Sequence, residues 1–309
     1  SRAKEASYAL SGYTSEQKNG MLDAIADALT EKGNLVRLAE ANALDVREAE
    51  KNGRPAPFID RLTLNEKRIA TMIEGLKQVA ALPDPVGEIV EERTLPNGLD
   101  LKRVRMPLGV IGIIYEARPN VTVDAAALCL KSGNAVVLRG GKDALNSNRV
   151  LYEIMRGAIS AVGCDAGAVG FIDDPSREAS KAMLGMDGYI DVIIPRGGEG
   201  LKKFVLDNAT MPVIASAGGN CHTYVEKTAD LDKAIPVIIN AKVQRPSTCN
   251  ALEHVLVDRG IAAEFLPRLY AALKENGVEV LGTQETDCLI YITARGSITN
   301  LTVTRTRVN

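Results

Sequence analysis

The sequence of 309 residues predicts an α/β fold with a parallel β-sheet. From about residue 107 onward, continuously apolar strands alternate with helical segments. Strands that are apolar on both faces are typical of parallel sheets covered by helices. Two glycine-rich turns, at 139–142 and 195–198, each follow one of these strands. Ligands of such sheets bind beyond the carboxyl ends of the strands, so we expect the two turns to lie on one binding edge.

The N-terminal part of the chain is predicted to be helical. Apolar residues recur at helical spacing after Ser15, and two further helices follow, one from Leu35 and one over 65–80. A β-hairpin is predicted over 88–106, because the turn signal at 96–98 separates two strand-like runs.

The remaining elements are predicted from alternating apolar runs and helical periodicity. Strands are expected over 110–115, 134–138, 168–172, 190–194 and 212–214. Four helices are expected between them. One covers 123–130, one follows the turn at 139–142 and ends at 155, one covers 176–186, and one begins near 201. A second α/β unit follows, with strands over 222–225 and 253–257 and helices over 231–241 and 262–275.

Composition excludes several classes of function. The formal net charge of −2 gives no basis for binding nucleic acid or an anionic membrane. The apolar runs are too short to span a bilayer, and we expect no signal peptide before the first helix. No metal-ligand motif is present, and the cysteines lack CxxC spacing, so we expect neither a metal site nor a disulfide framework and place the protein in the cytoplasm. The five cysteines are Cys129, Cys164, Cys221, Cys249 and Cys288.

Cys249 is the candidate nucleophile. It follows the turn residues Pro246, Ser247 and Thr248 and precedes an apolar strand, which places the thiol at the junction between a loop and a strand. Lys242 and Arg245 lie nearby in the sequence, and positive potential favours the thiolate, which is the nucleophilic form of cysteine. The alternative is a small buried hydrophobic residue, which is what most free cysteines are. We assign the other four cysteines to packing, and His222 and His254 to structure.

The glycine-rich turns are candidates for phosphate binding. Glycines allow close approach of the backbone, and the helix that follows offers free N–H groups to an anion. Each turn also carries cations, which suggests a ligand with more than one phosphate. A lysine at position 142 favours NADP(H) over NAD(H), because sites for the phosphorylated cofactor place a cation near the ribose. The alternatives are an ordinary strand–helix turn and a solvated surface lysine.

Four stretches together resemble a known family. They cover 107–124, 132–142, 194–198 and 244–250. These stretches are similar to those of the gamma-glutamyl phosphate reductase family, which belongs to the aldehyde dehydrogenase superfamily. The likeness runs in order from about residue 6 to about residue 280.

The resemblance implies an aldehyde dehydrogenase-like fold: a Rossmann-like cofactor domain, an α/β catalytic domain and a small β-arm for oligomerisation. The expected domains are 1–224, which holds the N-terminal helices, the dinucleotide-binding domain and the 88–106 hairpin of the arm, and 225–281, an incomplete catalytic domain. We leave 282–309 unassigned, because 282–290 resembles a family segment from further along and 291–309 has no counterpart that we can place. The boundary is expected near 221–226. The resemblance also implies a homo-oligomer.

The implied reaction is the NADPH-dependent reduction of L-glutamyl 5-phosphate to L-glutamate 5-semialdehyde, the second step of proline biosynthesis, with glutamate 5-kinase as pathway neighbour. Cys249 takes the nucleophile position, and Asn120 is the candidate amide donor of the oxyanion hole. The substrate-binding candidates are Arg118, Lys242 and Arg245. The cofactor-binding candidates are Arg139, Gly140, Gly141, Lys142, Pro195, Arg196, Gly197 and Gly198.

One departure from the hydrolysing aldehyde dehydrogenases is informative. They carry a glutamate as general base for the deacylating water, and Ser216 stands at that position here. Serine is not a base of suitable pKa unless another group activates it. The alternative functions are another acylating or hydrolysing aldehyde dehydrogenase, and a non-catalytic nucleotide-binding module.

Overall fold

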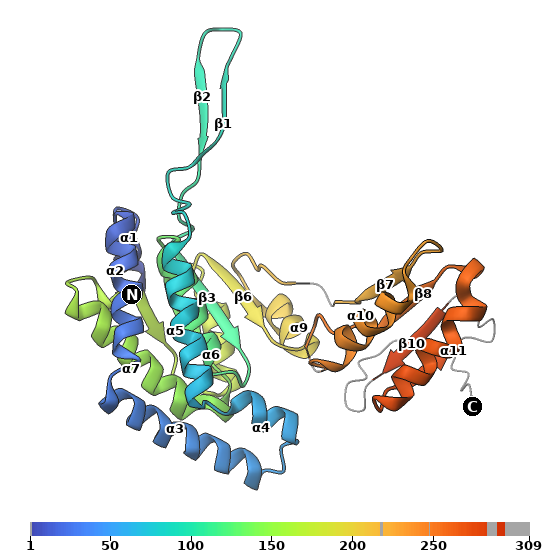
Figure 1. Cartoon of the computed structure of the whole chain (residues 1–309). Helices are drawn as coiled ribbons and strands as arrows, with labels where there is room; N and C mark the ends of the chain where they lie inside the picture. The colour runs from blue at the N-terminus through green and yellow to red at the C-terminus, as the bar shows by residue number, and fades with distance from the viewer. Residues whose placement is uncertain (1, 217–218, 247, 283–288, 294–309) are drawn as a thin grey trace. The chain divides into compact units, whose positions relative to one another are not determined.

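The computed structural model describes residues 2–216, 219–246, 248–282 and 289–293. The chain divides into two compact units, Ser1–Ala215 and Ser216–Asn309 (Figure 1). The sequence placed this division after residue 224, but β7 (His222–Val225) pairs with β8 (His254–Val257) and therefore belongs to the second unit.

The first unit begins with five helices. Their bounds are Arg2–Leu10 (α1), Ser15–Ala28 (α2), Lys32–Lys51 (α3), Ala56–Leu62 (α4) and Glu66–Ala81 (α5). The predicted helices correspond to α2, α3 and α5, whereas α1 and α4 were not predicted. Side-chain caps fix two of the predicted starts: Thr14 forms a capping box at α2, and Asn65 accepts a hydrogen bond from the backbone of Arg68 at α5.

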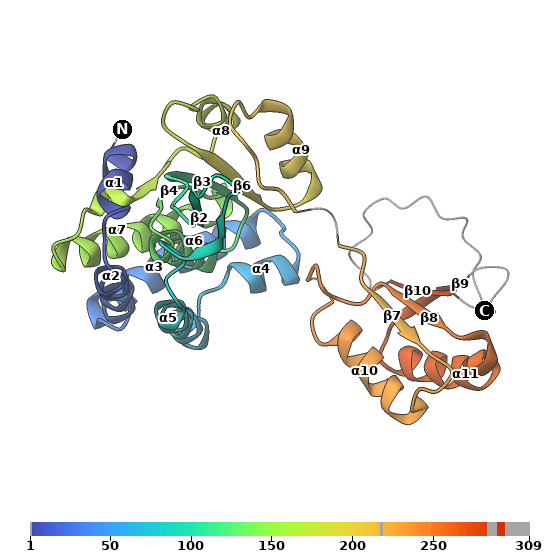
Figure 2. The same cartoon turned by 90° about the horizontal axis from the view of Figure 1, so that it is seen from above.

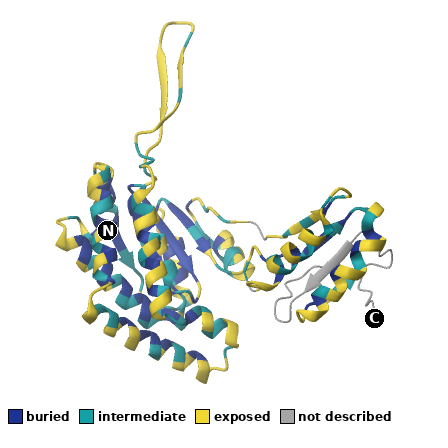
Figure 3. Ribbon diagram, viewed as in Figure 1, coloured by how far each residue is buried: buried dark blue, intermediate teal, exposed yellow. Residues whose placement is uncertain are grey.

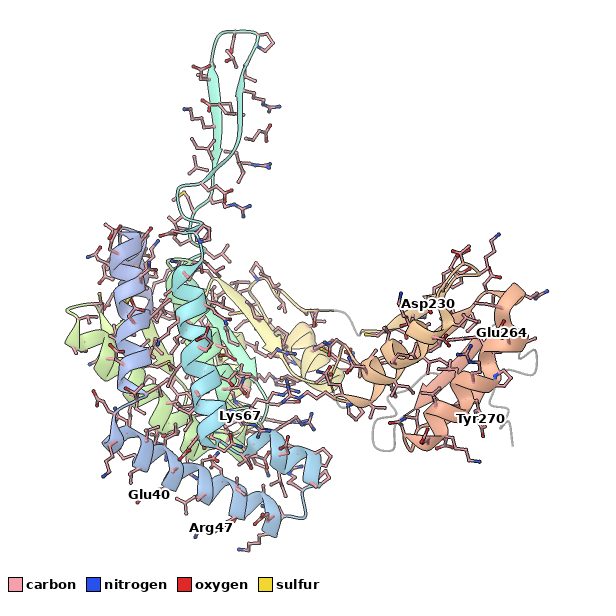
Figure 4. All side chains as sticks on the ribbon, viewed as in Figure 1. Glu40, Arg47, Lys67, Asp230, Glu264 and Tyr270 are labelled. Carbon is pink, nitrogen blue, oxygen red and sulfur yellow. The ribbon has the colours of Figure 1, made fainter. Side chains whose placement is uncertain are left out.

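The predicted hairpin is present as β1 (Ile89–Thr94) and β2 (Asp100–Val104), an antiparallel pair. Its turn contains Gly98 at a positive φ of 86°, which glycine adopts without steric cost. The hairpin extends away from the rest of the first unit (Figure 1), and almost all of its residues are exposed (Figure 3). Figure 4 shows its side chains directed outward on both sides.

A parallel sheet forms the centre of the first unit, as the apolar runs predicted. Its strands are β3 (Val110–Tyr115), β4 (Ala135–Arg139), β5 (Val169–Phe171) and β6 (Val192–Arg196), in the order β5-β4-β3-β6. All six residues of β3 are buried. The predicted strand at 212–214 is reduced to a single bridge, between Val213 and Ile193.

Helices cover both faces of this sheet (Figure 2). They are α6 (Asn120–Lys131) and α7 (Leu145–Ala161) on one face, and α8 (Arg177–Leu184) and α9 (Glu199–Asn208) on the other. The short 3₁₀ segments η1 (Lys142–Ala144) and η2 (Ala166–Ala168) precede α7 and β5. A parallel sheet that is covered by helices on both faces requires strands that are apolar on both faces, as the sequence predicted.

The second unit contains a mixed sheet in the order β7-β8-β10-β9, with β9 (Glu279–Gly282) and β10 (Leu289–Thr293) antiparallel to each other. Its helices are α10 (Leu231–Val243) and α11 (Arg259–Glu275). Asp230, which is labelled in Figure 4, caps α10 by accepting hydrogen bonds from two backbone N–H groups. Strand β10 lies in the stretch that the sequence left unassigned, and Cys288 lies outside the described residues.

No helix among the described residues is long and apolar enough to cross a membrane. Nor do the described residues contain a group of three or more His, Cys, Asp or Glu side chains placed to hold a metal ion.

Candidate active site

The two glycine-rich turns lie on one edge of the parallel sheet, as predicted. They follow β4 and β6, and both of these strands pair with β3. At the carboxyl end of β3, Ile114 is opposite Arg139 and Tyr115 is opposite Arg196. The turns therefore flank the residues that follow β3, which places a candidate phosphate-binding edge in the first unit.

Gly140 is required by the packing beneath this edge. A Cβ atom at Gly140 would lie only 2.2 Å from the Nδ2 atom of Asn148 and 3.3 Å from the ring of Tyr115. Asn148 is buried and accepts a hydrogen bond from the hydroxyl of Thr122, which also contacts the Tyr115 hydroxyl at 2.7 Å. Burial raises the pKa of Tyr115, so its phenol stays protonated. This buried network fixes the backbone of the first turn.

The cations of the two turns have different surroundings. The guanidinium of Arg139 donates to the backbone carbonyls of Pro175 and Ser176, and its Nε atom is buried without a hydrogen-bond partner among the described residues. Arg139 is therefore bound to the loop before α8. Lys142 and Arg196 are exposed, and within the described residues neither side chain has a hydrogen bond or ion pair. Of these three cations, Lys142 and Arg196 are therefore the ones available to bind an anionic ligand.

Glu116 lies between the two turns. Its carboxylate accepts a hydrogen bond from the backbone N–H of Gly198, at 3.3 Å, at the N-terminus of α9. A Cβ atom at Gly197 would lie 2.7 Å from the carboxyl carbon of Glu116, and one at Gly141 would lie 3.5 Å from its Cα. An anion thus already occupies this N-terminus, where the helix dipole and free N–H groups favour negative charge.

The residues after Glu116 include two further candidates. Asn120 is the first residue of α6, and its amide donates a hydrogen bond of 2.9 Å to the carboxylate of Asp124. The backbone N–H of Arg118 donates to the carbonyl of Glu116 at 2.7 Å, which tightens the turn after β3. Both side chains are half-buried.

In the second unit, Cys249 is exposed on a turn between α10 and β8. Two hydrogen bonds close the loop that carries it: the backbone N–H of Leu252 donates to the carbonyl of Ala241 at 3.1 Å, and the ammonium of Lys242 donates to the carbonyl of Leu252 at 2.9 Å. The side chain of Cys249 is thus accessible on an anchored loop, as a nucleophile requires. This excludes the alternative of a buried hydrophobic residue.

Lys242 is buried, with 4% of its surface exposed, and burial lowers its pKa. Its ammonium supports the nucleophile loop from beneath. Arg245, by contrast, is exposed, and within the described part of the chain its side chain forms no hydrogen bond or ion pair. Of the two cations predicted beside Cys249, Arg245 is the one available to an anionic substrate, and the predicted substrate contact of Lys242 stays a prediction.

We expect Lys242→Met to lower the free energy of unfolding of the second unit by about 1–3 kcal/mol, because the buried carbonyl of Leu252 loses its donor while the aliphatic stem is kept. Urea denaturation followed by circular dichroism measures this change. Lys233→Met is the matched control: Lys233 lies on the same helix, with 84% of its side chain exposed. Equal denaturation midpoints for the two variants would contradict the supporting role of Lys242.

Two residues beside Cys249 were not predicted to belong to the site. A Cβ atom at Gly219 would lie 2.9 Å from the carbonyl oxygen of Cys249, so only glycine fits there without a shift. The thiol of Cys221, which the sequence assigned to packing, donates to the same oxygen at 3.4 Å. The glycine pair at 218–219 was the sequence signal for this close approach, whereas nothing in the sequence indicated the contact of Cys221.

The two histidines lie opposite each other on β7 and β8, and their rings stack with centroids 4.5 Å apart. His254 is buried, and burial together with the neighbouring His222 lowers its pKa. The arrangement joins the two strands and agrees with the structural role that the sequence suggested.

Comparison with known proteins supplies a family context for this geometry. Residues 1–288 match the aldehyde dehydrogenase family. The chain is 55% identical over 285 residues to the gamma-glutamyl phosphate reductase of Carboxydothermus hydrogenoformans, covering 92% of this chain and 68% of that protein. It is 52% identical over 289 residues to the gamma-glutamyl phosphate reductase of Moorella thermoacetica, covering 94% and 69%. The crystal structure of gamma-glutamyl phosphate reductase from Thermotoga maritima superimposes with a TM-score of 0.86 at 46% identity, covering 92% and 68%.

Proposed function

Because this chain belongs to the aldehyde dehydrogenase family, and within it to the gamma-glutamyl phosphate reductases, we propose that it catalyses the NADPH-dependent reduction of L-glutamyl 5-phosphate to L-glutamate 5-semialdehyde and phosphate. This is the second step of proline biosynthesis. The observation that carries the proposal is the exposed thiol of Cys249 on a loop whose two ends are hydrogen-bonded to each other.

The chemistry begins with attack of the Cys249 thiolate on the acyl carbonyl carbon of the substrate. The carbon–oxygen bond to phosphate breaks, phosphate leaves as an anion, and a thioester with Cys249 remains. Backbone or amide N–H donors stabilise the oxyanion of the tetrahedral species, each by on the order of 3 kcal/mol. We propose the N–H of Cys249 and the amide of Asn120 for this role. One N–H of the Asn120 amide is hydrogen-bonded to Asp124, and the second N–H is the one that would donate to the oxyanion.

The edge formed by the two glycine-rich turns fits a nicotinamide dinucleotide. Gly140, Gly141, Gly197 and Gly198 leave the backbone open, and the N-terminus of α9 already holds a carboxylate as an anion would be held. Bound NADPH would supply hydride to the thioester carbon. The carbon–sulfur bond then breaks, and the Cys249 thiolate leaves as the semialdehyde forms. Lys142 and Arg196 are the cations that we propose for its phosphates. Arg139 supports the same edge through its bonds to the loop before α8, and Pro195 lies near the end of β6, the strand that carries the second turn.

Substrate binding needs cations for the phosphate and the α-carboxylate. Arginine suits bidentate recognition of such groups, and we propose Arg245 and Arg118. Ser216 stands where a hydrolysing relative would need a base. The absence of a base at this position protects the thioester from attack by water. This difference separates the proposed reductase from a hydrolysing dehydrogenase.

The dependence of the reverse reaction on phosphate tests the proposal. With L-glutamate 5-semialdehyde and NADP⁺, we expect NADPH to form beyond about one equivalent per active site only when phosphate is present, because phosphate must release the acyl group from Cys249. Absorbance of the reduced nicotinamide follows the reaction. Formation of NADPH at the same rate without phosphate would identify a hydrolysing enzyme instead.

Glu116→Gln tests the cofactor edge. Removing the negative charge at the N-terminus of α9 should strengthen the binding of the anionic NADP⁺ by about 0.3–1 kcal/mol, which is a factor of about two to five in Kd. Isothermal titration calorimetry measures this change. Glu178→Gln, which removes a carboxylate from the first turn of α8, is the control and should leave Kd unchanged. Weaker binding by Glu116→Gln would show that the carboxylate helps to hold the cofactor.

Membership of the family also suggests an oligomeric state, a neighbouring enzyme and a cellular compartment. We propose that the β1–β2 hairpin, with the exposed apolar side chains Ile89, Leu99 and Leu101, contributes to a homo-oligomer. The acyl phosphate is unstable in water, so glutamate 5-kinase is the proposed neighbour that delivers it. The described cysteines are free thiols, which fits the reducing cytoplasm proposed for this enzyme.

A further inference from the structure

A second thiol lies beside the nucleophile. The Sγ atom of Cys221 is 3.4 Å from the carbonyl oxygen of Cys249. Cys221 is half-buried and immediately precedes β7, and its own carbonyl accepts hydrogen bonds of 3.0 Å from the backbone N–H groups of Glu253 and His254. The sheet therefore holds Cys221 in place, and its thiol is directed at the residue that carries the reactive sulfur.

This contact brings the main chain of Cys249 next to the thiol of Cys221. In any cysteine the carbonyl oxygen and the Sγ atom are at most about 5 Å apart, because only four bonds separate them. A disulfide requires Cα atoms roughly 4.4–6.8 Å apart, a separation consistent with a thiol in contact with the partner's main chain. Cys249 lies on a turn with an exposed side chain, so rotation about χ1 can bring its sulfur toward Cys221.

We propose that Cys221 is a resolving thiol, which forms a reversible disulfide with Cys249 when a hydroperoxide oxidises the nucleophile. The Cys249 thiolate attacks the terminal oxygen of the peroxide, the O–O bond breaks, and the products are a sulfenic acid on Cys249 and an alcohol or water. The Cys221 thiolate then attacks the sulfenic sulfur. An S–S bond forms, the S–O bond breaks, and water leaves.

The consequence is protection of the nucleophile. An accessible thiolate without a partner proceeds from sulfenic to sulfinic acid, which thiols do not reverse. A disulfide is instead opened by a dithiol reductant through exchange. Neither step uses the substrate or the cofactor, so this inference stands or fails independently of the proposed reaction.

The other described cysteines are poorer partners. Burial raises the pKa of Cys129 to about 12, and only 4% of this residue is exposed. Burial also raises the pKa of Cys164, so its thiolate is disfavoured at neutral pH. The position of Cys288 lies outside the described residues, and the experiment therefore has to identify the partner directly.

The test is to treat the full chain with hydrogen peroxide at neutral pH, block the remaining thiols, and map the peptides by mass spectrometry without reduction. We expect a Cys221–Cys249 cross-linked peptide that is lost after treatment with dithiothreitol, with Cys249 again available for alkylation. A cross-link from Cys249 to Cys288 or to a second chain, or sulfinic acid on Cys249 with Cys221 still free, would overturn the proposal.

Two variants complete the experiment. In Cys221→Ser the cross-link should be absent, and repeated additions of peroxide should convert Cys249 to sulfinic acid, so that dithiothreitol no longer restores alkylation. Cys164→Ser removes another half-buried cysteine and should behave as the unaltered chain does. Equal recovery of Cys249 alkylation in all three proteins would show that Cys221 does not resolve the sulfenic acid.

Discussion

Replacing Cys249 by alanine is expected to lower the rate of semialdehyde formation by at least about 10⁴-fold, because the thiol that accepts the acyl group is removed and a hydroxyl is a weak nucleophile without a base. The binding of NADPH should remain within about twofold of its original Kd, since the proposed cofactor edge belongs to the first unit and the removed sulfur to the second. Steady-state kinetics and calorimetry measure the two effects separately.

The control for this prediction is Cys164→Ala, which removes a half-buried thiol from the first unit and should leave the rate unchanged. Cys249→Ser adds a stricter comparison, because a neutral hydroxyl keeps the shape of the residue but is a weak nucleophile without a base. Reduction that persists in Cys249→Ala while NADPH still binds would remove Cys249 from the mechanism. A variant that binds no NADPH would instead indicate a loss of folding.

Replacing Lys142 by alanine is expected to weaken the binding of NADPH about 10- to 150-fold, the equivalent of losing a charge-assisted hydrogen bond of about 1.5–3 kcal/mol. NADH lacks the 2′-phosphate, so its Kd should change little. The measured quantity is the ratio of the two dissociation constants, which isolates the phosphate contact from any general effect on the fold.

Lys181→Ala is the matched control for Lys142, because Lys181 is an exposed lysine on α8 of the same unit. It should leave both dissociation constants unaltered. An equal loss for NADPH and NADH in Lys142→Ala would place the lysine against a part of the cofactor that both forms share. No loss for either would assign it to the solvated surface.

The central sheet could be predicted from the sequence because its strands are apolar on both faces. In β3, for example, every residue from Val110 to Tyr115 is buried, and a continuous apolar run of this length carries the required signal. The hairpin was predicted for a different reason, since a turn with a glycine at positive φ separates its strands. Helix α4, of seven residues, has too few positions to establish a period, although Pro57 in its first turn was an available signal.

The candidate site could be predicted only in part. The sequence predicted that Cys249 lies on a loop and that the two glycine-rich turns share one edge of the sheet, because glycine and turn residues act locally on the backbone. It did not distinguish the cations. Arg139 and Lys242 have long side chains whose partners, the carbonyls of Ser176 and Leu252, are set by tertiary packing. The position of a charge along the chain does not give the direction of its side chain.

The contact between Gly219 and the carbonyl oxygen of Cys249 has a consequence for the design of variants. The space that a side chain at position 219 would fill is taken by the main chain of the nucleophile. Libraries that diversify the reactive loop should therefore hold position 219 constant, and a search for altered acyl acceptance has more freedom at exposed neighbours such as Arg245. Substitutions at position 219 and substitutions in the loop of Cys249 are therefore coupled, because the two segments are packed against each other although they are far apart in the sequence.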